Sequence, residues 1–158
     1  REGGIVQEML HQLKYKKRKE IGEVLGEIAG KKLLDSPVFS RPDLIIPVPV
    51  HPNKVRRRGY NQSTVFGKSL AAVTNIAMAD DILIKDTETS SQTGKSRTDR
   101  VKNVSEVFVL KKSEQIAGRH VLIVDDVITT GATLEACCQK LKEGGAKNIS
   151  VLSIAVAG

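Results

Sequence analysis

One stretch in the last third of the chain constrains the fold most: four apolar residues, two aspartates and a turn rich in threonine. The apolar run Val121–Val124 leads into Asp125 and Asp126, and the turn follows two positions later. A short continuous apolar run is typical of a strand buried on both faces of a parallel sheet. Apolar residues then recur at helical spacing within 132–141, which predicts a helix. The stretch therefore predicts a strand–loop–helix unit.

The loop of this unit has the chemistry of a phosphate site. A helix that begins directly after a strand aims free backbone N–H groups and the positive end of its dipole at the loop. The hydroxyls of Thr129, Thr130 and Thr133 add side-chain groups there. The carboxylates of Asp125 and Asp126 repel phosphate, but they suit ribose hydroxyls or a Mg²⁺ ion carried with the ligand. Both parts together indicate a sugar phosphate.

Other readings of the stretch explain it less well. A buried strand that ends in an ordinary acidic turn is the simplest alternative, but such a turn needs neither two acids nor three threonines. The stretch does not match the G-x-x-x-x-G-K-[ST] pattern of a Walker A loop. It also lacks G-x-G-x-x-G, which argues against a dinucleotide site.

The stretch resembles the 5-phosphoribosyl-1-diphosphate (PRPP) signature of type I phosphoribosyltransferases, in which a hydrophobic strand and two acids precede a T-T-G-x-T turn. The resemblance implies that Asp125 and Asp126 are catalytic and hold the ribose 2- and 3-hydroxyls. It also implies a 5-phosphate site made largely of backbone N–H groups at Thr129, Thr130, Gly131, Ala132 and Thr133. Gly131 lets the backbone approach the phosphate closely.

Two further segments are basic. The first, 47–62, follows a short strand pattern and is expected to be a loop. It carries three consecutive arginines, which are planar, bidentate donors for phosphate. The second, 92–103, lies in a polar connection longer than most in compact domains, and such connections are usually functional lids or disordered. A solvated basic loop is the alternative for the first segment, and a floppy surface loop for the second.

The two segments resemble the ComF/GntX branch of the phosphoribosyltransferases, and the similarity runs from about Leu13 to the end of the chain. The resemblance implies that the first segment binds diphosphate through Val50, His51, Arg56, Arg57 and Arg58. It implies that the second is a catalytic lid that supplies Lys95, Arg97 and Arg100. Members of this branch often carry an N-terminal zinc module of C-x-x-C pairs, and this sequence contains no such pair.

The alternation of strand and helix patterns predicts an α/β fold, a three-layer, mainly parallel sheet flanked by helices. In such sheets ligands bind at the carboxyl ends of the strands. Helices are expected at 5–13, 21–28, 62–73 and 132–141, and strands at 43–48, 82–85, 104–110, 120–124 and 149–156. The resemblance implies one type I phosphoribosyltransferase domain over 1–158, with a helical hood at 1–34 and a PRPP-binding core at 43–158.

The composition of the chain limits the kinds of partner that it can bind. The net charge of +7 indicates an anionic partner, such as nucleic acid, a membrane surface or a polyphosphate substrate. The basic run 14–19 is expected to be a solvated turn between two helices, with a nucleic-acid footprint as the alternative. Cys137 and Cys138 lie on the apolar face of a helix and are expected to be core residues in a reducing cytoplasm. No apolar stretch is long enough for a transmembrane helix.

The expected function is a Mg²⁺-dependent phosphoribosyltransferase that displaces diphosphate from PRPP with a nitrogen nucleophile. Mg²⁺ is expected to arrive with PRPP rather than on direct protein ligands. Base, amide and ammonia acceptors all stay open, and the resemblance allows a homodimer that the residues do not decide. The alternatives are a non-catalytic sensor of PRPP or nucleotide, and an accessory protein of DNA uptake suggested by the competence association of the branch.

Overall fold

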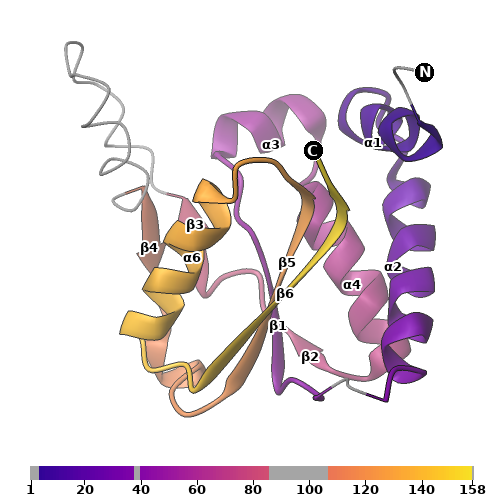
Figure 1. The fold of residues 1–158 in the computed structure, drawn as a ribbon. Helices are drawn as coiled ribbons and strands as arrows, with labels where there is room; N and C mark the ends of the chain where they lie inside the picture. The colour runs from indigo at the N-terminus through magenta and orange to yellow at the C-terminus, as the bar shows by residue number, and fades with distance from the viewer. Residues whose placement is uncertain (1–3, 38–39, 86–106, 158) are drawn as a thin grey trace.

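A four-stranded parallel sheet forms the centre of the molecule (Figure 1). The computed structural model describes residues 4–37, 40–85 and 107–157. The strands lie in the order β2-β1-β5-β6, and all three neighbouring pairs are parallel. Their bounds are β1 Leu44–Pro47, β2 Ala77–Met78, β5 His120–Ile128 and β6 Asn148–Val156. The α/β fold with a mainly parallel sheet is therefore confirmed.

Helices cover both faces of this sheet, which gives three layers (Figure 1). Helices α2 (Lys19–Leu34) and α4 (Gln62–Thr74) lie on one face, and α6 (Ala132–Glu143) lies on the other. Because successive strand residues point to opposite faces, β5 supplies both cores. Its Val121 and Ile123 pack in the α6 core, whereas Leu122 and Val124 pack in the α4 core. This explains the continuous apolar run in the sequence.

Two short strands form a separate antiparallel pair beside α6. Strand β3 (Leu83–Lys85) pairs with β4 (Phe108–Leu110), so neither extends the parallel sheet. Leu83 and Phe108 are buried in the core that α6 covers. The expected strand 104–110 is described only from residue 107. The 3-10 helix η2 (Ser113–Gln115) then leads towards β5.

Helix α2 packs against α4, and α1 packs against α2. Helix α1 (Ile5–Tyr15) meets α2 at a turn over 16–18. Three glycines spaced four residues apart on α2 are buried, and they let α2 approach α4 closely. A Cβ added at Gly26 would lie 2.6 Å from the backbone oxygen of Phe66. The backbones therefore meet at a distance that only glycine allows there.

Two strands of the sheet differ from the expectations. Strand β5 does not end at Val124 but continues through both aspartates to Ile128. This extension is possible because β6 pairs with β5 to its last residue. Strand β2 was not expected, since two residues carry no periodicity.

The first basic segment is also not wholly a loop, since it contains the helix α3 (Pro52–Arg58). Pro52 suits the first helical position because its missing N–H has no intrahelical partner there. The His51 side chain accepts a hydrogen bond from the backbone N–H of Asn53 at 3.1 Å. These two residues begin a helix that apolar periodicity does not reveal.

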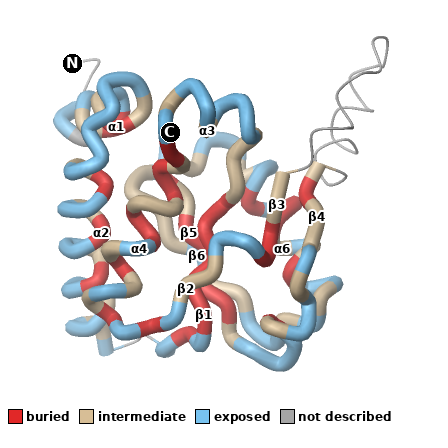
Figure 2. Tube along the Cα trace, turned by 180° about the vertical axis from the view of Figure 1, so that it is seen from behind, coloured by how far each residue is buried: buried red, intermediate tan, exposed pale blue. Residues whose placement is uncertain are grey.

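Burial follows the sheet, whereas α3 is largely exposed (Figure 2). The residues of β1 are all buried, and so is β5 from Val121 to Val124. Within the described ranges no helix is long and apolar enough to cross a membrane.

Candidate functional site

The connection between β5 and α6 lies at the carboxyl end of the parallel strands (Figure 1). It consists of Thr129, Thr130 and Gly131, and α6 begins at Ala132. Gly131 has φ +79°, a conformation that L side chains rarely adopt, although a Cβ there would meet nothing within 4 Å. Glycine is therefore needed for the shape of the backbone and not for space.

Asp125 and this connection line one small hollow of about 40 Å³. The structure therefore brings together one predicted carboxylate and four of the five predicted 5-phosphate residues, Thr129, Thr130, Gly131 and Thr133. The fifth, Ala132, is the first residue of α6, and its N–H is 3.4 Å from the Thr130 hydroxyl. A hollow at a helix N-terminus, bordered by hydroxyls, has donors suited to an anionic group.

The Asp125 carboxylate is held by the start of α4. One of its oxygens accepts hydrogen bonds from the Ser63 hydroxyl at 3.0 Å and from the Asp126 N–H at 2.8 Å. Asn61 caps α4 by accepting from the Ser63 N–H, and its amide donates to the Val48 oxygen just after β1. Burial, reinforced by the charge of Asp126, raises the pKa of Asp125 to about 6.

The Asp126 carboxylate is held from the N-terminal side instead. One oxygen accepts from the Val127 N–H at 2.9 Å, and the other lies 3.0 Å from the Lys14 ammonium of α1. Asp126 is only 9% exposed. The two neighbouring aspartates therefore contact different parts of the chain.

The end of α1 is anchored beside this pair. The buried hydroxyl of Tyr60 donates to the backbone oxygen of Leu13, whose side chain is fully buried. The Arg58 guanidinium lies 5.8 Å from the Tyr15 ring centre. Residues 16–19 are exposed, as expected of a solvated turn, but Lys14 at the start of the basic run is not part of that turn.

The predicted diphosphate residues lie at the same end of the sheet but outside the hollow. Val50 and His51 are half-buried between β1 and α3, and Arg56 and Arg57 are exposed on α3. Arg58 donates to the Gln62 side chain at 3.1 Å. The predicted lid residues Lys95, Arg97 and Arg100 lie outside the described residues.

A second hollow of about 520 Å³ opens between α1 and the ends of β5 and β6. It is bordered by polar side chains of α1 and by apolar or backbone atoms of the strands; the lining includes Gln7, His11, Lys14, Val127, Ala155 and Val156. Lys14 therefore borders this hollow and also contacts Asp126. Its volume is within the range of small-molecule sites.

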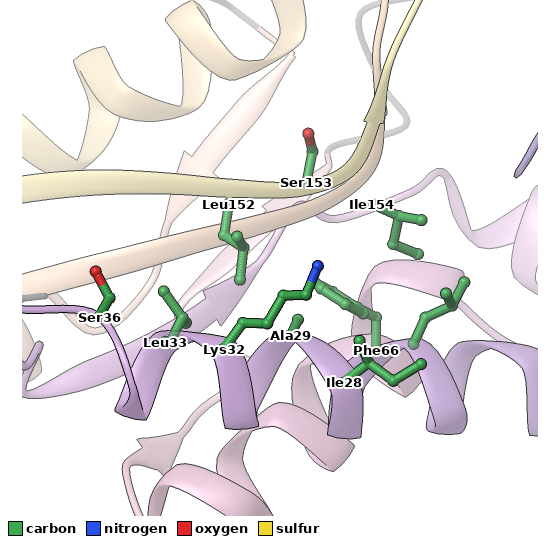
Figure 3. A pocket seen from close by; sticks show the side chains of 10 residues that line it. Ile28, Ala29, Lys32, Leu33, Ser36, Phe66, Leu152, Ser153 and Ile154 are labelled. Carbon is green, nitrogen blue, oxygen red and sulfur yellow. The ribbon is translucent and has the colours of Figure 1, made fainter.

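A third hollow, the groove between α2 and β6, has a different character (Figure 3). Figure 3 shows Leu33, Phe66 and Leu152 facing one another across it, with Lys32 as its charged side chain. No carboxylate and no residue of the β5–α6 connection borders this groove. We therefore place the candidate site at the end of β5.

The carboxylates suit a metal ion that arrives with a ligand. Mg²⁺ prefers six oxygen ligands, and it usually takes one or two carboxylates together with substrate phosphates and water. Asp125 and Asp126 offer that number of carboxylates, and the described residues contain no cluster of three or more His, Cys, Asp or Glu side chains. Two carboxylates together with phosphate oxygens of a ligand would make a donor set suited to Mg²⁺.

Sequence patterns did not point to Ser63, Tyr60 or Lys14 as residues of this region. Ser63 carries a weak signal, since a serine close to an asparagine at the start of a helix indicates a helix cap and not a partner for a distant carboxylate. Lys14 lies in a run of similar basic residues, and no local feature distinguishes it. Only tertiary packing brings it to Asp126.

The profile of the phosphoribosyl transferase domain family matches residues 60–157, more than half of the chain. The chain belongs to this phosphoribosyltransferase family. The matched range includes Asp125, Asp126 and the whole β5–α6 connection.

Relatives and solved structures agree with this membership. The chain is 32% identical over 146 residues to the "DNA utilization protein YhgH" of Shigella flexneri, covering 90% of this chain and 63% of that protein. It is 37% identical over 117 residues to the "Competence protein F" of Haemophilus influenzae, covering 73% and 51%. The chain thus spans about half to two thirds of these relatives. A crystal structure of adenine phosphoribosyltransferase shares the phosphoribosyltransferase fold, with a TM-score of 0.56 over 94% of this chain and 75% of that one, at 16% identity.

Proposed function

We propose that this phosphoribosyltransferase-family chain binds PRPP with Mg²⁺ and transfers its phosphoribosyl group to a nitrogen nucleophile. The observation that supports this most directly is the shared hollow of Asp125 and the β5–α6 connection. A phosphate bound by the N–H groups at the start of α6 would place the attached ribose next to the carboxylates. This spacing suits a sugar phosphate better than inorganic phosphate, which needs no neighbouring carboxylate.

The proposed reaction is a displacement at C1 of the ribose. The C1–O bond breaks and its electron pair leaves with diphosphate, while the acceptor nitrogen forms the C1–N bond and loses a proton. Positive charge develops on the ribose ring, and the carboxylates of Asp125 and Asp126 would stabilise it. Bound Mg²⁺ would neutralise part of the charge on the leaving diphosphate.

Basic side chains would complete the diphosphate site. Arg56 and Arg57 are exposed on α3, and α3 lies at the end of the sheet where β5 leads towards α6 (Figure 1), so both side chains are free to meet a ligand. We assign the diphosphate to them and to Val50, His51 and Arg58 by resemblance to the ComF/GntX branch. The same resemblance assigns Lys95, Arg97 and Arg100 to a lid that closes over the donor and excludes water.

The acceptor would enter from the hollow between α1 and the ends of β5 and β6. That hollow borders Lys14 and Val127, so it adjoins the residues proposed to hold the ribose. Apolar strand residues and the polar face of α1 would meet a flat nitrogenous molecule from opposite sides. Base, amide and ammonia acceptors all remain candidates.

Calorimetric titration of PRPP with and without Mg²⁺ tests this function. We expect Mg²⁺-dependent binding by the wild type, and a loss of affinity of about 100-fold or more in Asp125→Asn/Asp126→Asn, since several charge-assisted bonds disappear. The exposed neighbours Asp80 and Asp81 provide a matched control, Asp80→Asn/Asp81→Asn, which should bind as the wild type does. Equal binding by both double variants would remove the carboxylates from the site. Binding without diphosphate release from any acceptor would favour a PRPP sensor over an enzyme.

An exposed basic surface favours a second candidate function, binding of DNA. The exposed turn over 16–18 and the exposed Arg56 and Arg57 lie at one end of the molecule, and the contact of Arg58 with Tyr15 links them. Two relatives carry names that refer to DNA utilization and competence. Fluorescence anisotropy with a labelled oligonucleotide should show affinity that falls steeply with salt and weakens in Arg56→Ala/Arg57→Ala. No binding at low salt would exclude this candidate.

A further inference from the structure

Lys14 and Asp126 form an ion pair that is shielded from solvent. Their charged atoms lie 3.0 Å apart, and the two side chains are 26% and 12% exposed. Exposed ion pairs contribute little because water screens them, but attraction between charges grows as water is excluded. The other ion pairs in the described part of the chain include at least one partner that is more than 40% exposed. The Lys14–Asp126 pair therefore differs from ordinary surface pairs.

The pair fixes the direction of the Asp126 carboxylate. One oxygen accepts from the Val127 N–H and the other meets Lys14, so the carboxylate is held at both oxygens. An ionised carboxylate has about four acceptor positions. The oxygen that faces Lys14 is buried and accepts no regular hydrogen bond from the described residues, so the ion pair holds it in place and ligand contact is left to the other oxygen.

The position of Lys14 is itself determined by packing. Leu13 is fully buried, and its backbone oxygen accepts a hydrogen bond from Tyr60, which lies just before α4. Lys14 therefore extends from an anchored helix end and not from a mobile terminus. A side chain held in this way can position another group.

Charge supplies a second argument. PRPP is a polyanion, and the proposed ribose site contains two adjacent carboxylates, which repel it. Among the described residues Lys14 is the cation within ion-pair distance of either aspartate. Its ammonium offsets one of the two negative charges at the place where the donor would bind.

We propose that Lys14 is a positioning residue of the phosphoribosyl-donor site, whose ammonium orients the Asp126 carboxylate towards the ribose hydroxyls and offsets its charge. This inference rests on the proposed function, and it adds a residue from outside the matched range 60–157. It also makes α1 part of the donor site, although α1 is far from the β5–α6 connection in sequence.

The test is calorimetric titration of PRPP with Mg²⁺ into wild type, Lys14→Met, Lys14→Arg and Lys68→Met. Lys68 is an exposed lysine on α4, so its variant makes the same charge change away from the site. Truncating one partner of a shielded charge pair usually costs affinity, so we expect Lys14→Met to weaken PRPP binding by about tenfold or more. Lys14→Arg should restore most of this affinity, and Lys68→Met should bind as the wild type does.

A double-mutant cycle separates positioning from a general effect on the fold. If Lys14 acts through Asp126, Lys14→Met should have little further effect on PRPP affinity in an Asp126→Asn background. Thermal melting of each variant identifies any loss of folding, and Lys14→Arg serves as the readout if Lys14→Met does not fold. Equal affinities of Lys14→Met and Lys68→Met would overturn the inference and leave the proposed function intact. A folded wild type that does not bind PRPP would overturn both.

Discussion

The candidate site has two halves that are assembled differently. The loop half comprises Asp125 and residues 129–133, and it lies within nine consecutive residues at the end of β5 and the start of α6. The helix half comprises Lys14, Tyr60 and Ser63, which come from α1 and the start of α4. The first half needs only one strand–loop–helix unit, whereas the second needs α1 and the start of α4 to meet the end of β5.

This difference separates what local chemistry specifies from what packing specifies. In the loop half, a glycine with positive φ and the start of a helix shape the backbone whatever surrounds them. In the helix half, the site depends on how closely α1 and α2 approach α4. We therefore expect the two halves to respond to different substitutions.

The largest expected effect is on the helix half, through Gly26→Ala. The added Cβ would lie 2.6 Å from the Phe66 backbone oxygen, so α2 must move away from α4. We expect a loss of about 2–3 kcal/mol in the free energy of unfolding, measured in urea. Gly22→Ala is the graded control, because its nearest neighbour is a Val65 side-chain atom at 3.0 Å. Equal losses in the two variants would show that the close backbone approach is unimportant.

The next effect is expected from Asp125→Asn, which should raise the free energy of unfolding. Its pKa is raised to about 6 from an ordinary value of 3.8, so the folded state binds a proton more tightly than the unfolded state does. The resulting stability is present below about pH 4 and is lost as pH rises through 6. Asp125→Asn does not have this loss, so it should be more stable than the wild type by about 2–3 kcal/mol at pH 7.

Urea unfolding at several pH values tests whether Asp125→Asn is more stable than the wild type and how that difference depends on pH. The advantage of Asp125→Asn should shrink as pH falls from 6 and vanish near pH 4, while PRPP affinity at pH 7 should be lower than in the wild type. Asp81→Asn is the control, because the Lys112 ammonium lowers the pKa of that exposed carboxyl, so this variant should gain no stability as pH rises. An advantage that is independent of pH would contradict a buried, ionised Asp125.

The same contrast explains how far the sequence allowed prediction. The parallel sheet, α4, α6 and β6 were predictable because each has its own apolar period or cap, as at Asn61. The loop half was predictable because its chemistry is contiguous. Helix α3 was missed, because a seven-residue helix that buries no residue has no apolar stripe.

The helix half could not be predicted, for a physical reason. Lys14 differs from its basic neighbours only in where α1 ends, and that position depends on contacts of Leu13 with distant residues. The continuation of β5 through the aspartates likewise depends on pairing with β6 and not on local propensity. Both features belong to the tertiary structure.

A smaller effect is expected in the loop half, from Gly131→Ala. Because φ is +79° and the added Cβ meets nothing within 4 Å, the cost is backbone strain of about 1–2 kcal/mol. Gly118→Ala is a close match, since Gly118 has φ +72° and the same open space but precedes β5 at the other end of the sheet. Thermal melting should show similar losses for both, whereas only Gly131→Ala should weaken PRPP binding. Equal PRPP affinities of Gly131→Ala and Gly118→Ala would show that the β5–α6 connection does not bind PRPP.

The smallest effect is expected from Tyr60→Phe, which tests whether the helix half is held by single contacts. The substitution removes the hydroxyl that donates to the Leu13 oxygen and leaves that buried oxygen without this donor. We expect a loss of about 1 kcal/mol in the free energy of unfolding, with Tyr15→Phe as the control because Tyr15 is 60% exposed. PRPP affinity should fall only slightly in Tyr60→Phe, since Lys14 and Asp126 both remain. An affinity loss as large as that of Lys14→Met would mean that the anchoring of α1, rather than the ammonium of Lys14, makes this helix part of the donor site.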